Sequence, residues 1–168
     1  YHASNNVQRI ELSIFKNTQT IYIMSLIRAY QSADYNAIID LFLLNTPAFF
    51  CEEEQQDLER FLDNEIENFF VAEEDGVVVA CGGSNIKENT GFLSWYIVHP
   101  DHQGKGLGKI LALHNLTILQ ANPDLDNIEV RTSQLVYPFY EKLGFKLIGT
   151  QGHYWGQNMH LYHMRLQD

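Results

Sequence analysis

The sequence predicts a single mixed α/β domain, and three observations carry this prediction. The chain has 168 residues, 45% of them hydrophobic and 12% aromatic, which suffices for one globular core. Segments with a helical spacing of apolar residues alternate with short β-rich runs. In the middle of the chain, at 92–118, a strand-like run, a glycine-rich loop and an amphipathic segment follow one another.

The N-terminal part differs from the rest of the chain. Residues 1–23 do not open with methionine and show no clear pattern until Ile21, whereas Met24 to Arg28 resembles a natural start. We therefore expect 1–23 to be an N-terminal extension, either vector-derived or upstream. The single domain is then expected to span 24–168.

The elements follow from spacing and turn residues. A short strand from Leu26 leads into a first helix that is expected to end before Pro47. Asp75-Gly76 predicts a hairpin turn, because this dipeptide suits the tight turn between two strands. The other expected elements are helices at 52–69, from Ile110 and at 137–143, and strands at 69–73, 77–84, 92–98, 128–132, 145–149 and 159–165.

The net charge of −10 is placed unevenly. Residues 1–99 hold 5 basic and 15 acidic side chains, while residues 100–168 hold 6 of each. This excess repels phosphate backbones, so nucleic acid is not an expected partner. It favours a cationic small molecule or a basic peptide, unless the acidic side chains only form a solvated helix face.

Several further classes are excluded by what the sequence lacks. Its longest apolar runs are too short to cross a membrane and it shows no signal peptide, so a cytoplasmic protein without membrane contact is expected. Cys51 and Cys81 have no CxxC spacing, which argues against a disulfide framework. The seven histidines lack supporting Cys, Asp or Glu spacing, so no metal site is expected.

The loop after the strand at 92–98 is the most informative segment. Gly104, Gly106 and Gly108 alternate with other residues, which lets successive N–H groups turn toward one point at a helix start. Such a point binds an anion. The spacing fits neither a dinucleotide-binding loop nor a P-loop, because Ile110 stands where a P-loop has Ser or Thr.

Two motifs together resemble a known family. The segment 103–108, Gln-Gly-Lys-Gly-Leu-Gly, matches the Q/R-x-x-G-x-G/A loop of the GNAT N-acetyltransferases. The segment 138–145 resembles that family's F/L-Y-x-x-x-G-F motif. The resemblance covers about residues 25–166. It implies a mostly antiparallel, splayed sheet of about six to seven strands with about four helices, and direct acetyl transfer from acetyl-CoA to a primary amine.

The resemblance also assigns site residues. Tyr140 matches the tyrosine that protonates the leaving thiolate, although without the motif an ordinary core tyrosine would be the favoured interpretation. Tyr137 competes with it only because it lies one helical turn away. Backbone contacts to acetyl-CoA are implied for Ile97 and Val98. The pyrophosphate is implied to bind the loop formed by Gln103, Gly104, Lys105, Gly106, Leu107, Gly108 and Lys109.

The acceptor side is less defined. The strand at 91–94 lacks the glutamate that some family members use as a base, so no base is assigned. Glu73 and Glu74, beside the turn, are interpreted as solvated. Residues 153–155 either line the acceptor mouth or pack on one another.

Two other functions stay open at this stage. A non-catalytic acyl-CoA-binding or sensor module would explain the missing carboxylate. An acidic interaction domain would use the carboxylates of residues 52–75, but it leaves both motifs unexplained. The acceptor and the oligomeric state, with a homodimer as one option, are not specified by the sequence.

Overall fold

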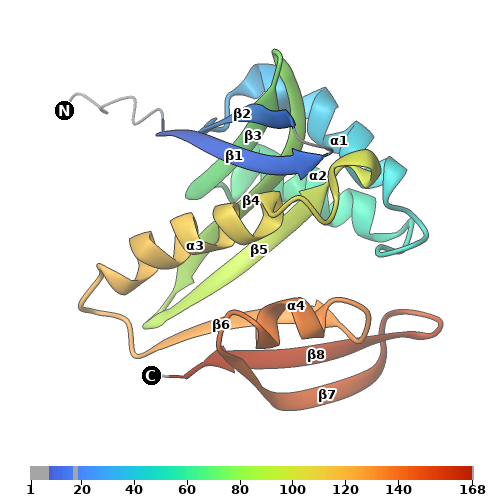
Figure 1. The fold of residues 1–168 in the computed structure, drawn as a ribbon. Coiled ribbons are helices and arrows are strands. Elements are labelled where there is room, and N and C mark those ends of the chain that lie inside the picture. Colours follow the sequence, from blue (N-terminus) through green and yellow to red (C-terminus); the bar gives the residue numbers. More distant parts are fainter. Residues whose placement is uncertain (1–7, 17–18, 168) are drawn as a thin grey trace.

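The computed structural model describes residues 8–16 and 19–167 (Figure 1). Its strands are β1 (Gln8–Lys16), β2 (Gln19–Ala29), β3 (Asn68–Glu74), β4 (Val77–Lys87), β5 (Thr90–Val98), β6 (Asn127–Ser133), β7 (Phe145–Gly156) and β8 (Met159–Leu166). Its α-helices are α1 (Tyr35–Leu44), α2 (Glu54–Asn64), α3 (Leu107–Gln120) and α4 (Tyr137–Glu141), and two 3-10 turns are η1 (Ser32–Asp34) and η2 (Pro100–His102).

All eight strands belong to one sheet, in the order β1-β2-β3-β4-β5-β6-β8-β7. Only β5 and β6 pair in parallel, and the other neighbours are antiparallel. The predicted mixed α/β fold is therefore confirmed. The sheet has one strand more than the six to seven expected, because β1 adds an edge strand from the segment interpreted as an extension.

Three boundaries differ from the sequence-based expectation. Strand β2 begins at Gln19, before the expected start at Leu26, and includes residues 23 and 24. Helix α2 ends at Asn64, before the predicted 69, since Asn68 onward pairs with both β2 and β4 as β3. Strand β7 extends past 149 to Gly156, because pairing with β8 prolongs it.

The helices cover both faces of the sheet (Figure 1). Phe69 and Val71 of β3 pack with α1 and α2, whereas Phe70 and Ala72, which alternate with them, pack against α3. Helix α4 lies on the same face as α3, in a cluster with the residues around Phe145. Strand β3 is thus covered on both faces, whereas most residues of the edge strand β7 are exposed.

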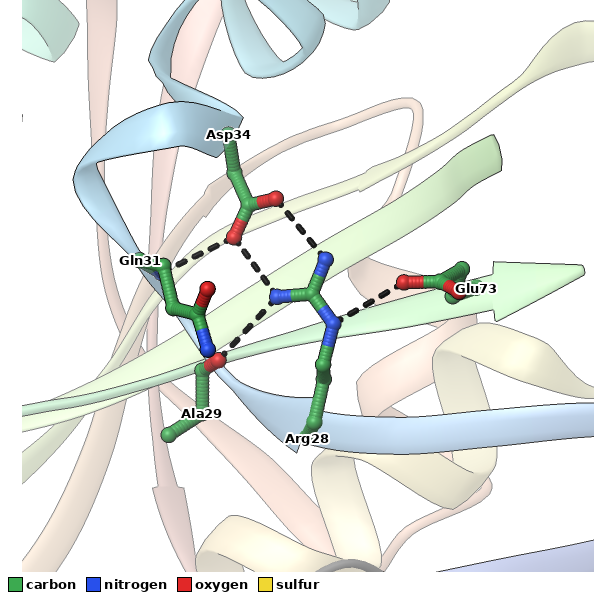
Figure 2. A network of polar contacts seen from close by, with 5 residues as sticks. All are labelled: Arg28, Ala29, Gln31, Asp34 and Glu73. Carbon is green, nitrogen blue, oxygen red and sulfur yellow. Dashed lines mark hydrogen bonds and ion pairs between the residues drawn. The ribbon is translucent and has the colours of Figure 1, made fainter. Parts of the chain in front are cut away.

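A polar network fixes the start of α1 to the sheet (Figure 2). Arg28 of β2 binds both carboxylate oxygens of Asp34, at 2.7 and 2.8 Å, and donates to Glu73 of β3 at 2.9 Å. The hydrogen bond from Arg28 holds the pKa of Asp34 below its usual value. A lowered acid pKa contributes stability above the ordinary pKa, and this contribution is lost as the pH falls through the lowered value.

The sheet opens where β5 leaves β6. The two strands pair only from Thr90 to Leu93, while β6 continues alongside β8 to Ser133. Near the same place the register between β4 and β5 shifts, and Trp95 adopts a φ of 54°. A bulge of this kind bends and twists a strand. The two arms of the sheet therefore diverge, as the ribbons of β5 and β6 show in Figure 1.

Among residues 8–16 and 19–167, no helix has the length and apolar character needed to cross a membrane.

Candidate active site

The glycine loop lies between the end of β5 and the start of α3. Gly104 and Gly106 have φ values of 74° and 91°, a left-handed conformation that residues with a side chain rarely adopt. Gly106 is the N-cap of α3, and no side chain caps the helix there. The first amides of a helix have no acceptor within it, so those of Leu107, Gly108 and Lys109 are available to a ligand.

The side chain of Gln103 has another role in this structure. It donates to the Asn45 side chain at 2.9 Å and to the Val98 carbonyl at 3.1 Å. Asn45, at the C-cap of α1, is buried and also donates to Val98, at 3.1 Å. Sequence reasoning missed Asn45, because no local pattern shows that the end of α1 meets the loop. These bonds brace the entry to the loop. The Gln103 amide is also engaged, because it donates to the Pro100 carbonyl at 3.3 Å, so it is not free for the backbone contact expected of it.

The two strand residues of the predicted site differ in direction. The His99 amide bonds to the Val79 carbonyl of β4, and alternate residues of an antiparallel strand direct their backbone groups to opposite sides. The backbone N–H and C=O of Ile97, the register partner of Cys81, are therefore directed toward β4. The backbone N–H and C=O of Val98 are directed toward the opening between β5 and β6. Its carbonyl already accepts two side chains, so its amide is the group left for a ligand.

Tyr140 lies where the arms diverge. Pro138 stands in the first turn of the short helix α4, where its missing N–H costs nothing. The Tyr140 side chain is 4% exposed, and its ring lies 6.4 Å from that of Tyr96 and 5.8 Å from that of Phe145. Burial raises its pKa above that of an ordinary tyrosine. The hydroxyl is therefore protonated at neutral pH, as an acid must be.

Tyr137 occupies a different environment from Tyr140. Its ring stacks on Tyr162 at 4.8 Å, and it is absent from the cleft that Tyr140 lines. Phe139 packs near the start of α3: a Cβ at Gly108 would lie 3.7 Å from its ring and 3.6 Å from Val98. Helix α4 thus lies between the glycine loop and the opening of the sheet.

A cleft of about 880 Å³ occupies the opening. One wall comes from the loop between α1 and α2, from the residues of α2 and just after it, and from β4. The floor comes from β5, and the other wall from β6, α4, β7 and β8. One buried hydroxyl group of its lining, that of Ser133, has no hydrogen-bond partner among the described residues. Its aromatic lining consists of Phe49, Phe50, Phe61, Phe92, Trp95, Tyr96, Tyr140 and Trp155.

The charged lining of the cleft was not visible in any motif. Glu54, Glu65 and Glu67 stand on the α2 side, Lys87 at the end of β4, and Arg131 and His163 on the far wall. His163 contacts Glu129 at 2.7 Å, and Arg165 also binds this carboxylate. The lining of the cleft thus has three carboxylates and two permanent cations, Lys87 and Arg131.

The interpretation of Glu73 and Glu74 as solvated is wrong. Glu73 binds Arg28, as Figure 2 shows, and Glu74 lies 3.1 Å from His102. Sequence spacing could not reveal these partners, since β2 and the loop before α3 are brought beside β3 by the sheet. Neither carboxylate lines the cleft.

The aromatic residues of the last hairpin divide between the two expected roles. Trp155 lines the cleft and donates to the Thr132 carbonyl at 3.3 Å. Tyr154 points elsewhere: it stacks edge-on with Trp155 at 4.7 Å and holds Arg131 over its ring at 4.9 Å. His153 accepts the Asn158 amide within the hairpin. No group of three metal-ligating side chains occurs in the described part of the chain.

Comparison with known proteins identifies the family. Residues 35–145 match the model of the Acetyltransferase (GNAT) family. An acetyltransferase of Yersinia enterocolitica is 28% identical over 122 residues, which cover 71% of this chain and 86% of that protein. The match to the family model spans both motifs, the loop and α4. The chain belongs to the GNAT acetyltransferase family and is an acyltransferase.

Solved structures share the fold at lower identity. The ribosomal-protein-S18-alanine N-acetyltransferase of Escherichia coli matches with a TM-score of 0.70 and 21% identity, over 85% of this chain and 93% of that one. An aminoglycoside 6'-N-acetyltransferase complexed with coenzyme A matches with a TM-score of 0.66 and 16% identity, over 83% and 94% of the two chains.

Proposed function

We propose that this enzyme transfers the acetyl group of acetyl-CoA directly to a primary amine, on a small molecule or on a peptide or protein, held in the cleft. The observation that carries the proposal is that the uncapped start of α3 and the buried Tyr140 meet at one opening of the sheet. The solved relatives act, by their names, on a ribosomal-protein alanine and on an aminoglycoside, so both kinds of amine occur among proteins of this fold.

The residues present fit acetyl-CoA. The backbone from Gly104 to Lys109 offers amides for a pyrophosphate, and its two left-handed glycines have open space around them. Lys105 and Lys109 add positive charge to that end. The Val98 amide and the unpartnered hydroxyl of Ser133 offer donors along the opening. Bound there, acetyl-CoA supplies an activated acyl carbonyl and a thiolate leaving group. Ile97 contributes through its buried side chain, which supports this strand.

Tyr140 is the proposed acid. Its hydroxyl donates a proton to the departing sulfur. The O–H···S contact strengthens as negative charge develops on that sulfur. Burial raises the pKa of Tyr140, and the same desolvation raises the pKa of a thiol, as it does for Cys81 in the core, to about 12. Since burial raises the pKa of the phenol and of the thiol alike, the free energy of proton transfer between them changes little.

Direct transfer is favoured over a covalent acetyl-enzyme. A nucleophilic cysteine needs a lowered pKa, because the thiolate is the reactive form. Burial instead raises the pKa of both Cys51 and Cys81, and the latter lies in the core. Intact-mass spectrometry of the enzyme with acetyl-CoA alone tests this point, and an added acetyl group on the protein would contradict direct transfer.

A cationic acceptor suits the charge of the chain. The first 99 residues carry the whole net charge of −10, and three carboxylates stand along the α2 side of the cleft. The aromatic lining adds ring faces that attract ammonium groups.

A free-thiol release assay with a panel of polycationic, neutral and anionic amines tests the function. We expect thiol release that depends on the amine, with an acetylated amine found by mass spectrometry. Binding of acetyl-CoA without turnover on any amine would instead support the non-catalytic module.

A further inference from the structure

One carboxylate of the cleft stands out from the others. Glu54 lies in the first turn of α2 and lines the cleft, whereas the strand at 91–94, on the floor, offers no carboxylate. Residues four and seven positions apart share a helix face, so Glu54 lies on the same face as Leu58 and Phe61. Leu58 is fully buried and Phe61 packs on Trp95 of β5. Glu54 therefore lies on the inward face of the helix and is partly buried.

The position of Glu54 is held by the loop that precedes α2. The Cys51 amide donates to its Oε2 at 2.8 Å. Phe50, in the same loop, stacks on Trp95 at 6.2 Å. On the other side, Cys51 lies against β7, since a Cβ at Gly156 would be 2.6 Å from its sulfur. The loop thus bridges both walls of the cleft, and Glu54 is fixed between them.

Each of the three carboxylates of the cleft accepts a hydrogen bond, and that of Glu54 comes from the Cys51 amide. Glu65 pairs with Arg60, and Glu67 accepts the Ile86 amide at 2.9 Å. Glu54 has no ion-pair partner within the described residues. Burial, with a smaller contribution from Asp57 and Glu53, raises its pKa to about 7. The remaining charged groups around the cleft are Lys87, Arg131 and His163.

We propose that Glu54 is the general base that accepts a proton from the acceptor amine. This inference rests on the proposed acetyl transfer. First, the Glu54 carboxylate takes one proton from the ammonium group. The nitrogen lone pair that this frees then bonds to the thioester carbonyl carbon. The C–S bond then breaks and sulfur takes the Tyr140 proton. The nitrogen returns its surplus proton to the Tyr140 oxygen, so one proton leaves through Glu54 to solvent.

The protonation of Glu54 sets the direction of the pH effects. Ionised Glu54 predominates above about pH 7, so turnover should rise with pH through that region. The opposite sign applies to stability. The folded-state pKa lies above the ordinary 4.5, so the folded protein holds this proton longer than the unfolded chain does. Folding therefore loses stability as the pH rises from that ordinary value to the folded one.

The test uses E54Q, which keeps an oxygen to accept the Cys51 amide. The control is D63N, which removes the same charge from an exposed position of the same helix. With an amine that the wild-type enzyme acetylates, we expect E54Q to lower kcat by about 10²-fold or more, with KM for the amine changed less than kcat. The acid limb of the pH profile should disappear in E54Q and remain in D63N.

Two measurements do not depend on turnover. Glutamate labelled at its side-chain carboxyl should give one NMR resonance that titrates near pH 7 and is missing in E54Q. The Tm of E54Q should exceed that of the wild type above pH 7 and approach it below the ordinary glutamate pKa. A lower Tm of E54Q above pH 7 would show that the ionised Glu54 stabilises the fold, which contradicts a base whose charge is disfavoured by burial.

The outcomes separate this inference from the proposed function. Wild-type enzyme that binds acetyl-CoA in calorimetry but acetylates no amine would overturn both. An active wild type with an equally active E54Q would overturn only the role of Glu54. A higher KM for the amine with unchanged kcat in E54Q would also overturn the role of Glu54 as a base, because Glu54 would then only bind the ammonium group.

Discussion

The cofactor end and the acceptor end of the proposed active site differ in what they offer a ligand. At the loop 103–109, the groups available are mostly backbone amides, presented by two left-handed glycines and the uncapped start of α3. In the cleft, the available groups are side chains from α2, β5, β6 and β7. Backbone amides recognise any pyrophosphate of the right shape, whereas side chains select one acceptor among many.

This difference also affects how each end responds to substitution. The cofactor end depends on backbone conformation, so a side chain matters there only when it disturbs φ or blocks a close approach. The acceptor end depends on pKa and position of individual groups, so a change of one atom can remove a chemical step. Four predictions test this contrast, in order of expected effect.

The largest effect is expected for Tyr140→Phe. Loss of the hydroxyl removes the proton donor for sulfur and should lower kcat by about 10²-fold or more, while the Kd for acetyl-CoA changes little. Steady-state kinetics and calorimetry measure the two quantities. Tyr137→Phe is the matched control, since that ring stacks on Tyr162 outside the cleft. If Tyr137→Phe loses the activity instead, the acid is assigned to the wrong tyrosine.

A smaller effect is expected from acetyl-CoA itself. A ligand that binds only the folded state at 100 times its Kd stabilises it by about 2.7 kcal/mol. For a chain of this size that corresponds to a rise in Tm of about 5–10 °C. Differential scanning fluorimetry with acetyl-CoA measures the rise, with adenosine as a control that lacks the pyrophosphate. An unchanged Tm at millimolar acetyl-CoA would argue against a cofactor site.

Gly106→Val should weaken acetyl-CoA binding and leave the chemical step intact. A β-branched residue at a φ of 91° costs about 1–2 kcal/mol, and the loop relieves this strain by leaving the conformation that directs its amides. We expect Kd to rise about 5- to 30-fold, with kcat at saturating acetyl-CoA largely retained. Gly149→Val is the control, because that glycine has open space and no left-handed backbone. Equal affinity in both variants would remove Gly106 from the binding site.

The smallest effect concerns the acceptor. If carboxylates attract a cationic amine, its KM should rise a few-fold between low and high salt, because charges separated by more than about 8–10 Å are screened at physiological ionic strength. A neutral amine of similar size serves as the reference. A KM that is indifferent to salt, or a preference for acidic acceptors, would overturn the attraction while leaving acetyl transfer in place.

The secondary structure was largely predictable because its signals are local. The Asp75-Gly76 turn and the strand, loop and helix around Gly106 were predicted close to where they occur. Helix α2 was predicted too long, because the helical spacing of apolar residues continues past Asn64 and only pairing with β2 and β4 makes the next segment a strand. Residues 1–7, at the start of the expected extension, lie outside the described residues.

The sequence by itself determined the family, and it located the glycine loop and the motif that contains Tyr140, since these depend on residues that are close together in the chain. Only the tertiary structure decided which distant groups meet. It brought Asn45 to Gln103, and it paired Glu73 with Arg28. It also placed Glu54 in the cleft, where burial raises its pKa to about 7. The physical reason is that a pKa and a hydrogen-bond partner are set by the surrounding side chains and the water they exclude, and packing brings these surroundings from separate parts of the chain.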